Sequence, residues 1–198
     1  MLLRADAADA LEGGAEGEGA AVADLPGDRA DGGVRLAQQV GREGLMAGVF
    51  ALYADTIMPG LGRTDDRTFV GAFQSIDRAI INPLFLPTFL GALVLTGLAA
   101  VLHLGADGRS VLPWAVAAFV LYLAVFVITI GVNVPLNDGL KAAGEPDRIA
   151  DLAAVRERFN AAKWIRWNLV RTVACTAAFG CLCWALVLYG RITTPTGG

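Results

Sequence analysis

Four polar or aromatic side chains near the carboxyl-terminal end of the sequence could form a chemically active face on one helix. Successive members are four, three and four residues apart, which brings them onto one side of an α-helix: Trp164, Asn168, Arg171 and Cys175. Arg171, with Trp167 one turn away, could stabilise a developing oxyanion or pair with Asp138 or Asp55. In the other interpretation the tryptophans only anchor the helix at a membrane surface, and Arg171 extends to lipid phosphates.

A second polar group occupies residues 133–138, with the sequence Asn-Val-Pro-Leu-Asn-Asp. Pro135 lacks a backbone N–H and disturbs the hydrogen bonding of a helix. The side chains of Asn133 and Asn137 can satisfy the carbonyl groups that are released, or they can bind a ligand. Both interpretations stay open at this point.

Asp55 is the one carboxylate inside the apolar stretch from Leu45 to Met58. Burial raises the pKa of a carboxyl group toward the range of a general base, although Asp55 could equally be the polar end of that stretch. The sole histidine, His103, is distant in sequence from both polar groups. The three cysteines fit no common metal or redox spacing, and we expect them to pack inside the fold: Cys175, Cys181 and Cys183.

The sequence lacks a glycine-rich dinucleotide motif, a phosphate loop and a Ser-His-Asp arrangement. We therefore expect no bound metal, no cofactor and no nucleic-acid partner.

Membrane-spanning helices must position these residues. Apolar runs over residues 83–104, 111–134 and 169–189 are each about as long as the roughly 20 residues that cross a bilayer. The composition agrees, with 55% hydrophobic residues and a mean hydropathy of +0.54. The sequence predicts an integral membrane protein whose main partner is the lipid bilayer.

The first span is the difficult one. The stretch from Leu45 to Met58 is too short to cross the bilayer, and extending it backwards would place Arg35, Arg42 and Glu43 in hydrocarbon. Three or four spans are therefore both open. The expected fold class is all-α, an integral membrane four-helix bundle with a short first span and amphipathic cytoplasmic helices.

The amino-terminal region differs in composition from the rest. Residues 1–44 hold nine acidic and four basic residues, and few of them are branched or aromatic. We expect a disordered acidic tail over residues 1–43, a transmembrane helical domain over 44–191 and a disordered carboxyl-terminal tail over 192–198. Charges at Arg4, Asp6 and Asp9 argue against a cleaved signal peptide.

Two shorter helices are predicted between the spans. After the Met-Pro-Gly break at 58–60, Thr64 is the expected N-cap of a helix whose apolar residues are Phe69, Phe73, Ile76 and Ile80. This helix either lies against the bundle at the membrane surface or covers a cavity as a lid. A second amphipathic helix follows Pro146. Basic residues crowd both loops, which predicts that the loops face the cytoplasm of a multi-pass protein in the plasma membrane.

The order and spacing of several motifs resemble a family of small four-helix membrane proteins that includes the anthrone oxygenases. These motifs are Met58-Pro59-Gly60-Leu61, Arg63 to Val70, Asn82-Pro83, Asn133 to Asn137 and Trp164 to Thr172. The resemblance covers about residues 44–191. The charged stretch from Val34 to Glu43 departs from the complete apolar first helix of that family.

The resemblance implies an activity. Characterised members oxidise an anthrone to an anthraquinone with molecular oxygen and no added cofactor, because loss of a methylene proton gives a carbanion that reacts with oxygen by itself. It implies a lipophilic aromatic substrate, with Arg171 stabilising the enolate and Asn137 and Asn168 orienting the substrate. Asn133, Trp164 and Trp167 are the expected substrate-binding residues. The alternative is a non-catalytic membrane scaffold or subunit that holds a partner on its amphipathic helices.

Overall fold

The computed structural model describes residues 26–105 and 108–193, and these residues form helices and connecting turns without a strand. The elements are α1 (Pro26–Leu52), η1 (Tyr53–Ile57), α2 (Met58–Gly62), α3 (Asp66–Ile80), α4 (Phe85–Leu102), α5 (Leu112–Ile128), η3 (Thr129–Asn133), α6 (Val134–Ala142), η4 (Pro146–Arg148), α7 (Leu152–Phe159) and α8 (Ala161–Thr193). The segments η1 and η3 are π-helical, and each continues directly from one α-helix into the next.

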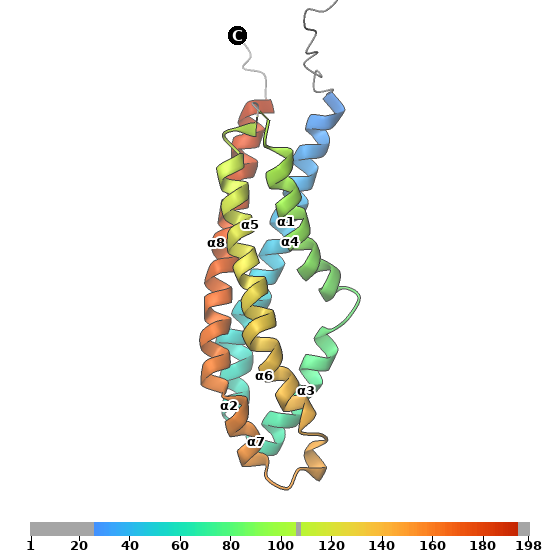
Figure 1. Ribbon diagram of the computed structural model, residues 1–198, viewed down its shortest axis with the longest axis vertical. Coiled ribbons are helices and arrows are strands. Elements are labelled where there is room, and N and C mark those ends of the chain that lie inside the picture. Colours follow the sequence, from blue (N-terminus) through green and yellow to red (C-terminus); the bar gives the residue numbers. More distant parts are fainter. Residues whose placement is uncertain (1–25, 106–107, 194–198) are drawn as a thin grey trace, which may run out of the picture.

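Four helical segments are long and apolar enough to cross a membrane: Asp31–Gly62, Phe85–Leu102, Leu112–Ala142 and Leu152–Thr193. They form an elongated bundle in which α1 begins and α8 ends at the same end (Figure 1). We call this the terminal end. The opposite end, which we call the loop end, carries α2, α3 and α7. The all-α, four-helix membrane fold predicted from the sequence is thus confirmed.

The first span is longer than the sequence suggested. Helix α1 begins at Pro26, so residues 26–43 are helical and do not belong to a disordered tail. The buried side chains of this region follow helical spacing: Leu36, Gln39, Glu43, Met46 and Phe50. This pattern is hard to recognise in the sequence, because the polar residues Gln39 and Glu43 lie on the face of α1 that packs inside the bundle. Helix α8 likewise includes residues 192 and 193. The remainder of both expected tails, residues 1–25 and 194–198, lies outside the described residues.

Three clusters of buried side chains form the core. The terminal-end cluster joins Leu36 to small residues of α4, α5 and α8. The middle cluster contains Phe50, Phe89, Tyr122 and Cys175. The loop-end cluster is richer in aromatic residues and consists of Met58, Phe69, Val70, Phe73, Leu140, Val155, Phe159 and Trp164.

The two predicted amphipathic helices pack against each other. The ring centres of Phe73 on α3 and Phe159 on α7 are 4.7 Å apart, and Arg156 of α7 lies over the ring of Phe69. The N-cap of α3 is Asp65, whose carboxylate accepts a hydrogen bond from the Thr68 N–H; the predicted cap one residue earlier is wrong. These two helices therefore form much of the loop end of the bundle.

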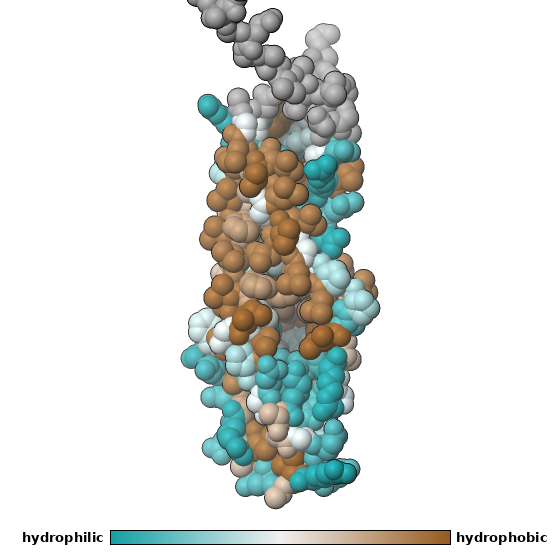
Figure 2. All heavy atoms as spheres, turned by 45° about the vertical axis from the view of Figure 1, so that its right-hand side comes forward, coloured by the Kyte–Doolittle hydropathy of each residue, from teal (hydrophilic) through white to brown (hydrophobic). Residues whose placement is uncertain are grey.

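The molecular surface divides in the same way. On the face shown in Figure 2, an apolar band covers most of the part toward the terminal end, with hydrophilic residues along one edge, and hydrophilic residues dominate the part toward the loop end. The exposed apolar side chains of α4, α5 and α8 include Leu90, Val94, Val120, Val127 and Val173. An exposed apolar surface of this kind is what a helical protein presents to lipid hydrocarbon.

Candidate active site

A cavity of about 280 Å³ lies between the middle cluster and the loop-end cluster. Phe50 and Phe89 border it from the middle cluster, and Phe73 and Trp164 from the loop-end cluster. Most of the other lining side chains are apolar, and the polar ones are Tyr53, Asp77, Thr129, Asn137, Asp138, Lys141 and Arg171. An apolar pocket with a few converging polar groups is typical of a site for a small organic ligand.

Both π-helical segments contribute to the wall of this cavity. Tyr53 of η1 and Thr129 and Ile130 of η3 line it. In η3 the N–H of Val134 bonds to the carbonyl of Thr129, five residues earlier, immediately before Pro135. Wider turns of this kind occur frequently at functional sites, and here they carry the polar side chains of Tyr53 and Thr129, which line the cavity.

Arg171 is the buried cation of the cavity. Its side chain is 5% exposed, and its guanidinium donates hydrogen bonds to the hydroxyl of Thr129 (3.0 Å) and to Oδ1 of Asn168 (2.8 Å). The guanidinium carbon lies 4.6 Å from the ring centre of Phe50 and 5.6 Å from that of Trp164. Its Nε has no partner, and no ion pair is formed with a carboxylate of the described residues.

An unpaired guanidinium inside an apolar bundle is costly, because it loses hydration without gaining a counter-ion. The cation–π contacts with Phe50 and Trp164 offset part of this cost. The remaining positive charge faces the cavity, where an anion formed on a bound ligand would be its natural partner.

A chain of hydrogen bonds and ion pairs runs along the cavity wall on the loop-end side of Arg171. The indole Nε1 of Trp164 donates to Oδ1 of Asn137 (2.8 Å), and Nδ2 of Asn137 donates to Oδ1 of Asp77 (2.7 Å). The other oxygen of Asp77 lies 2.7 Å from Nζ of Lys141, which also contacts Asp138 at 3.0 Å. The chain joins α8, α6 and α3, so their relative positions determine the shape of the site.

The structure brings together part of the predicted site. Arg171, Asn137 and Trp164 line the cavity. Asn168 and Asn133 are fully buried next to it: Asn168 bonds to Arg171, and Asn133 donates a weak hydrogen bond of 3.4 Å to the carbonyl of Trp164. Neither of these two amides borders the cavity.

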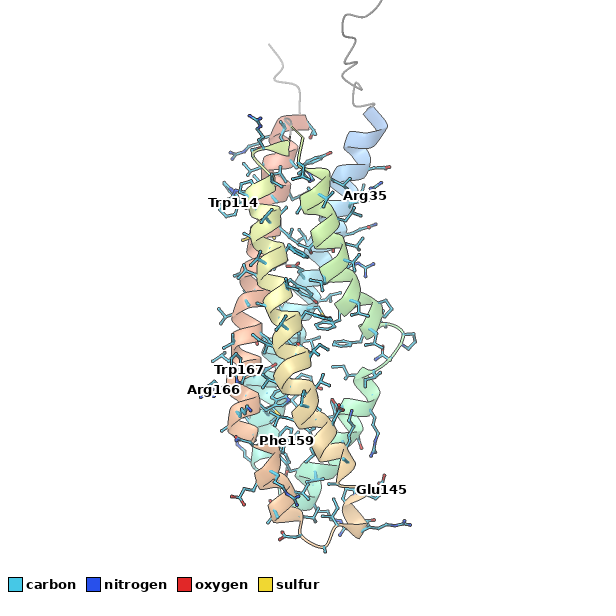
Figure 3. The ribbon with its side chains drawn as sticks, in the orientation of Figure 1. Arg35, Trp114, Glu145, Phe159, Arg166 and Trp167 are labelled. Atoms are coloured by element: carbon cyan, nitrogen blue, oxygen red, sulfur yellow. The ribbon has the colours of Figure 1, made fainter. Side chains whose placement is uncertain are left out.

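Two other predicted residues lie elsewhere. Trp167 is not part of the lining and lies with Arg166 on the outer side of α8 (Figure 3). Helical geometry explains this, because Trp167 is three residues beyond Trp164 and therefore points about 60° away from it. Asp55 is exposed and accepts a hydrogen bond from the hydroxyl of the neighbouring Thr56. It forms no ion pair with Arg171 and does not line the cavity.

Sequence reasoning missed Asp77, Lys141 and Tyr53. A signal for Asp77 exists: it is four residues after Phe73 and eight after Phe69, on the apolar face of an amphipathic helix where a carboxylate is unusual. No comparable signal exists for Tyr53, because only the π-helical turn directs it into the cavity.

Within the residues that the structure describes, no group of three histidine, cysteine or acidic side chains could hold a metal ion. The three cysteines are free. The expectation of a site without metal or cofactor stays a prediction.

The bundle and its cavity define a small multi-pass membrane protein with an aromatic, arginine-containing site. The sequence model of the anthrone oxygenase family matches residues 83–181, and the chain belongs to this family. The matched segment includes Asn137, Trp164 and Arg171, whereas Tyr53 and Asp77 precede it. Comparisons with curated proteins and with solved structures found no match to the chain.

Proposed function

We propose that this protein is a cofactor-independent oxygenase that converts a lipophilic polycyclic aromatic of the anthrone type into the corresponding quinone. One observation carries the proposal: a buried arginine, with no carboxylate partner among the residues that the structure describes, lines an aromatic cavity. The family assignment supports the same activity.

The cavity is accessible from the side of the bundle. Several of its lining residues are also exposed on the outer surface, namely Ile81, Leu86, Leu90 and Ile130. The face turned forward in Figure 2 is recessed near the border between the apolar band and the hydrophilic part. A substrate dissolved in the bilayer would enter here without crossing water, and molecular oxygen, which is apolar, would follow the same path.

Arg171 supplies the main chemical requirement. When an anthrone loses a methylene proton, the negative charge is delocalised onto its carbonyl oxygen. A fixed guanidinium stabilises this charge more strongly in an apolar cavity than in water, and it needs no reorganisation to do so. Asn168 holds the guanidinium in place, and Asn137 is a positioning residue on the opposite part of the wall.

We propose that the protein lies in the plasma membrane with its loop end in the cytoplasm, and the distribution of charge supports this orientation. Basic residues of the loop end are Arg63, Arg67, Arg78, Lys141, Arg148, Arg156, Arg158, Lys163 and Arg166, against Arg29, Arg35, Arg109 and Arg191 at the terminal end. By the positive-inside rule both chain ends then face outward.

Oxygen consumption tests the proposal. Purified protein in lipid nanodiscs is mixed with a model anthrone, and oxygen uptake and quinone absorbance are followed against empty nanodiscs, because anthrones also oxidise without a catalyst. We expect the wild type and Arg166→Gln, an exposed arginine of the same helix, to be active and Arg171→Gln to be inactive. Equal rates with wild type and with empty nanodiscs would refute the proposal.

The structure gives less support to the scaffold alternative. That alternative places a partner on the amphipathic helices α3 and α7, and their apolar side chains Phe69, Phe73, Val155 and Phe159 are already buried in the loop-end cluster. A stoichiometric partner that co-purifies, together with normal cellular function of Arg171→Gln, would favour that alternative.

A further inference from the structure

Removal of a proton from carbon requires a base, and the cavity contains one well-placed candidate. Among the described residues, two carboxylates line the cavity, Asp77 and Asp138. The Asp138 side chain is 60% exposed, whereas that of Asp77 is 10% exposed. Asp77 therefore lies inside the wall, while Asp138 lies at its rim.

The surroundings of Asp77 hold its carboxylate in one orientation. Asn137 donates to one oxygen at 2.7 Å, and the ammonium of Lys141 contacts the other at 2.7 Å. An ion pair requires the ionised carboxylate, which is the form that accepts a proton. Each oxygen retains a further lone pair, because a carboxylate has about four acceptor sites.

Asp77 and Arg171 are placed so that both could contact one bound substrate. Both side chains line the cavity, together with Tyr53. A flat substrate between them would have its carbonyl oxygen near the cation and its methylene carbon near the carboxylate. The other charged groups around Asp77 are Lys141 and Asp138 on α6, and Arg78 on its own helix, which pairs with Glu145.

We propose that Asp77 is the general base of the reaction and that it acts twice in each turnover; this inference rests on the proposed oxygenation. In the first half, the methylene C–H bond breaks, the proton passes to Asp77, and the electron pair is delocalised onto the carbonyl oxygen near Arg171. Molecular oxygen then accepts the two electrons from the carbon, forming a C–O bond. The resulting peroxide takes the proton back from Asp77.

The second half uses the same carboxylate. Asp77 removes the remaining hydrogen of that carbon as a proton, the electron pair forms the new C=O bond, and the O–O bond breaks with departure of hydroxide. The proton held by Asp77 converts the hydroxide into water. A methylene group and one oxygen molecule thus give one carbonyl group and one water. No net proton leaves the cavity, so a single base enclosed by Asn137 and Lys141 is sufficient.

The test compares Asp77→Asn with the wild type over a range of pH, with the model anthrone in nanodiscs. Asp55→Asn is the matched control, since Asp55 is an exposed carboxylate outside the cavity. At neutral pH we expect kcat of Asp77→Asn to be about 100-fold lower or more, the usual effect of a general base. As pH rises and the substrate ionises in solution, the first proton transfer is no longer needed, so oxygen uptake by Asp77→Asn should approach that of wild type, while quinone formation, which needs the second proton transfer, should stay slower. Neither rate of Arg171→Gln should recover. Uncatalysed oxidation is subtracted at every pH.

A second variant is a control for misfolding, because Asp77→Asn removes one of the two carboxylates that contact Lys141. Asp77→Glu keeps the charge and should retain partial activity at neutral pH. Three outcomes separate the claims. An active wild type with an equally active Asp77→Asn overturns the role of Asp77 alone. A folded Asp77→Asn that takes up no oxygen with ionised substrate shows a structural role and also overturns it. A wild type no faster than empty nanodiscs overturns the proposed function itself.

Discussion

The side-chain amide of Asn168 donates a hydrogen bond of 2.9 Å to the carbonyl of Phe50, which is 118 positions away in the sequence. The carbonyl belongs to α1, just before the π-helical segment η1, and the other atom of the same amide accepts from Arg171. One residue thus joins the first span to the last and holds the guanidinium beside the Phe50 ring. The position of the buried cation therefore depends on the packing of α1 against α8.

Replacing Arg171 by methionine should separate activity from stability. The variant removes a buried charge that has no counter-ion within residues 26–105 and 108–193, so we expect its free energy of unfolding to stay within about 1 kcal/mol of wild type. We expect kcat/KM to fall about 100-fold or more, as when another fixed stabiliser of an oxyanion is lost. Thermal unfolding in detergent and oxygen uptake measure the two quantities. Strong destabilisation with unchanged kcat/KM in the folded fraction would instead indicate a structural arginine.

Asn137 and Trp164 should be energetically coupled. Asn137→Ala leaves the indole N–H without its acceptor and frees Asp77, and we expect a loss of about 1–3 kcal/mol of stability. Trp164→Phe removes the N–H and keeps most of the ring. In a double-mutant cycle the two changes should be non-additive by about 0.5–1.5 kcal/mol. Trp184→Phe is the control, since Trp184 packs against Trp114 far from the cavity, and it should be additive with Asn137→Ala.

Gln39 should limit the stability of the terminal half of the bundle. Its side chain is 2% exposed, and neither of its polar atoms has a partner among the described residues. We expect Gln39→Leu to raise the free energy of unfolding by about 1–2 kcal/mol, because an unpaired buried amide is removed. The control is Gln38→Leu, at an exposed position of the same helix, which should change little. A lower melting temperature for Gln39→Leu would contradict the expectation.

The N-cap of α3 should make stability dependent on acid. The backbone N–H and the hydroxyl of Thr68 both donate to Asp65, and they lower the pKa of this carboxyl group below its usual value of 3.8. A lowered pKa in the folded state means that this contribution is present at neutral pH and is lost as pH falls through the acidic range. Asp65→Asn keeps a capping side chain without titrating. Comparing the melting temperatures of both proteins from pH 7 downward checks this, and parallel curves would contradict it.

A bulky residue at the side opening should slow substrate entry. Ile130 is 53% exposed and also lines the cavity, so Ile130→Trp would narrow the opening without touching Arg171. We expect kcat/KM for the model anthrone to fall about tenfold, equivalent to about 1.4 kcal/mol, with a smaller change in kcat. Val127→Trp is a matched control, because Val127 is 60% exposed on the preceding turn and does not line the cavity. Equal effects of both variants would exclude this route of entry.

Hydropathy alone predicted much of the fold. The runs at 83–104, 111–134 and 169–189 became α4, α5 with η3, and α8, because an uninterrupted apolar surface of that length has no stable place in water. The length of the first span is underestimated from the sequence, because Arg35, Arg42 and Glu43 are all treated as charges that would face hydrocarbon. In the structure Glu43 is buried and bonds to Thr96, while Arg42 reaches the carbonyl of Pro87. Which face of a helix a charge occupies is set by tertiary packing.

Helical spacing can connect site residues only where they share one helix. Asn137 is expected from a separate polar group, and it lines the same cavity. Spacing placed Trp164, Asn168 and Arg171 on one face of α8, and the structure keeps them together. Asp77 and Tyr53 come from other elements, and no sequence spacing connects them with α8. Trp167 is expected at the substrate because it lies one turn from Arg171, but in the structure it is outside the cavity lining, on the outer side of α8.

The two π-helical segments have a consequence for chain length. Each contains one residue more than a regular α-helical turn would hold, so the helix beyond it is rotated by about 100° relative to an uninterrupted one. Shortening the chain by a single residue within 53–57 or 129–133 would straighten the helix and swing the buried side of α2 or α6 out of the bundle. Within these two segments the protein should tolerate substitutions better than the deletion of a single residue.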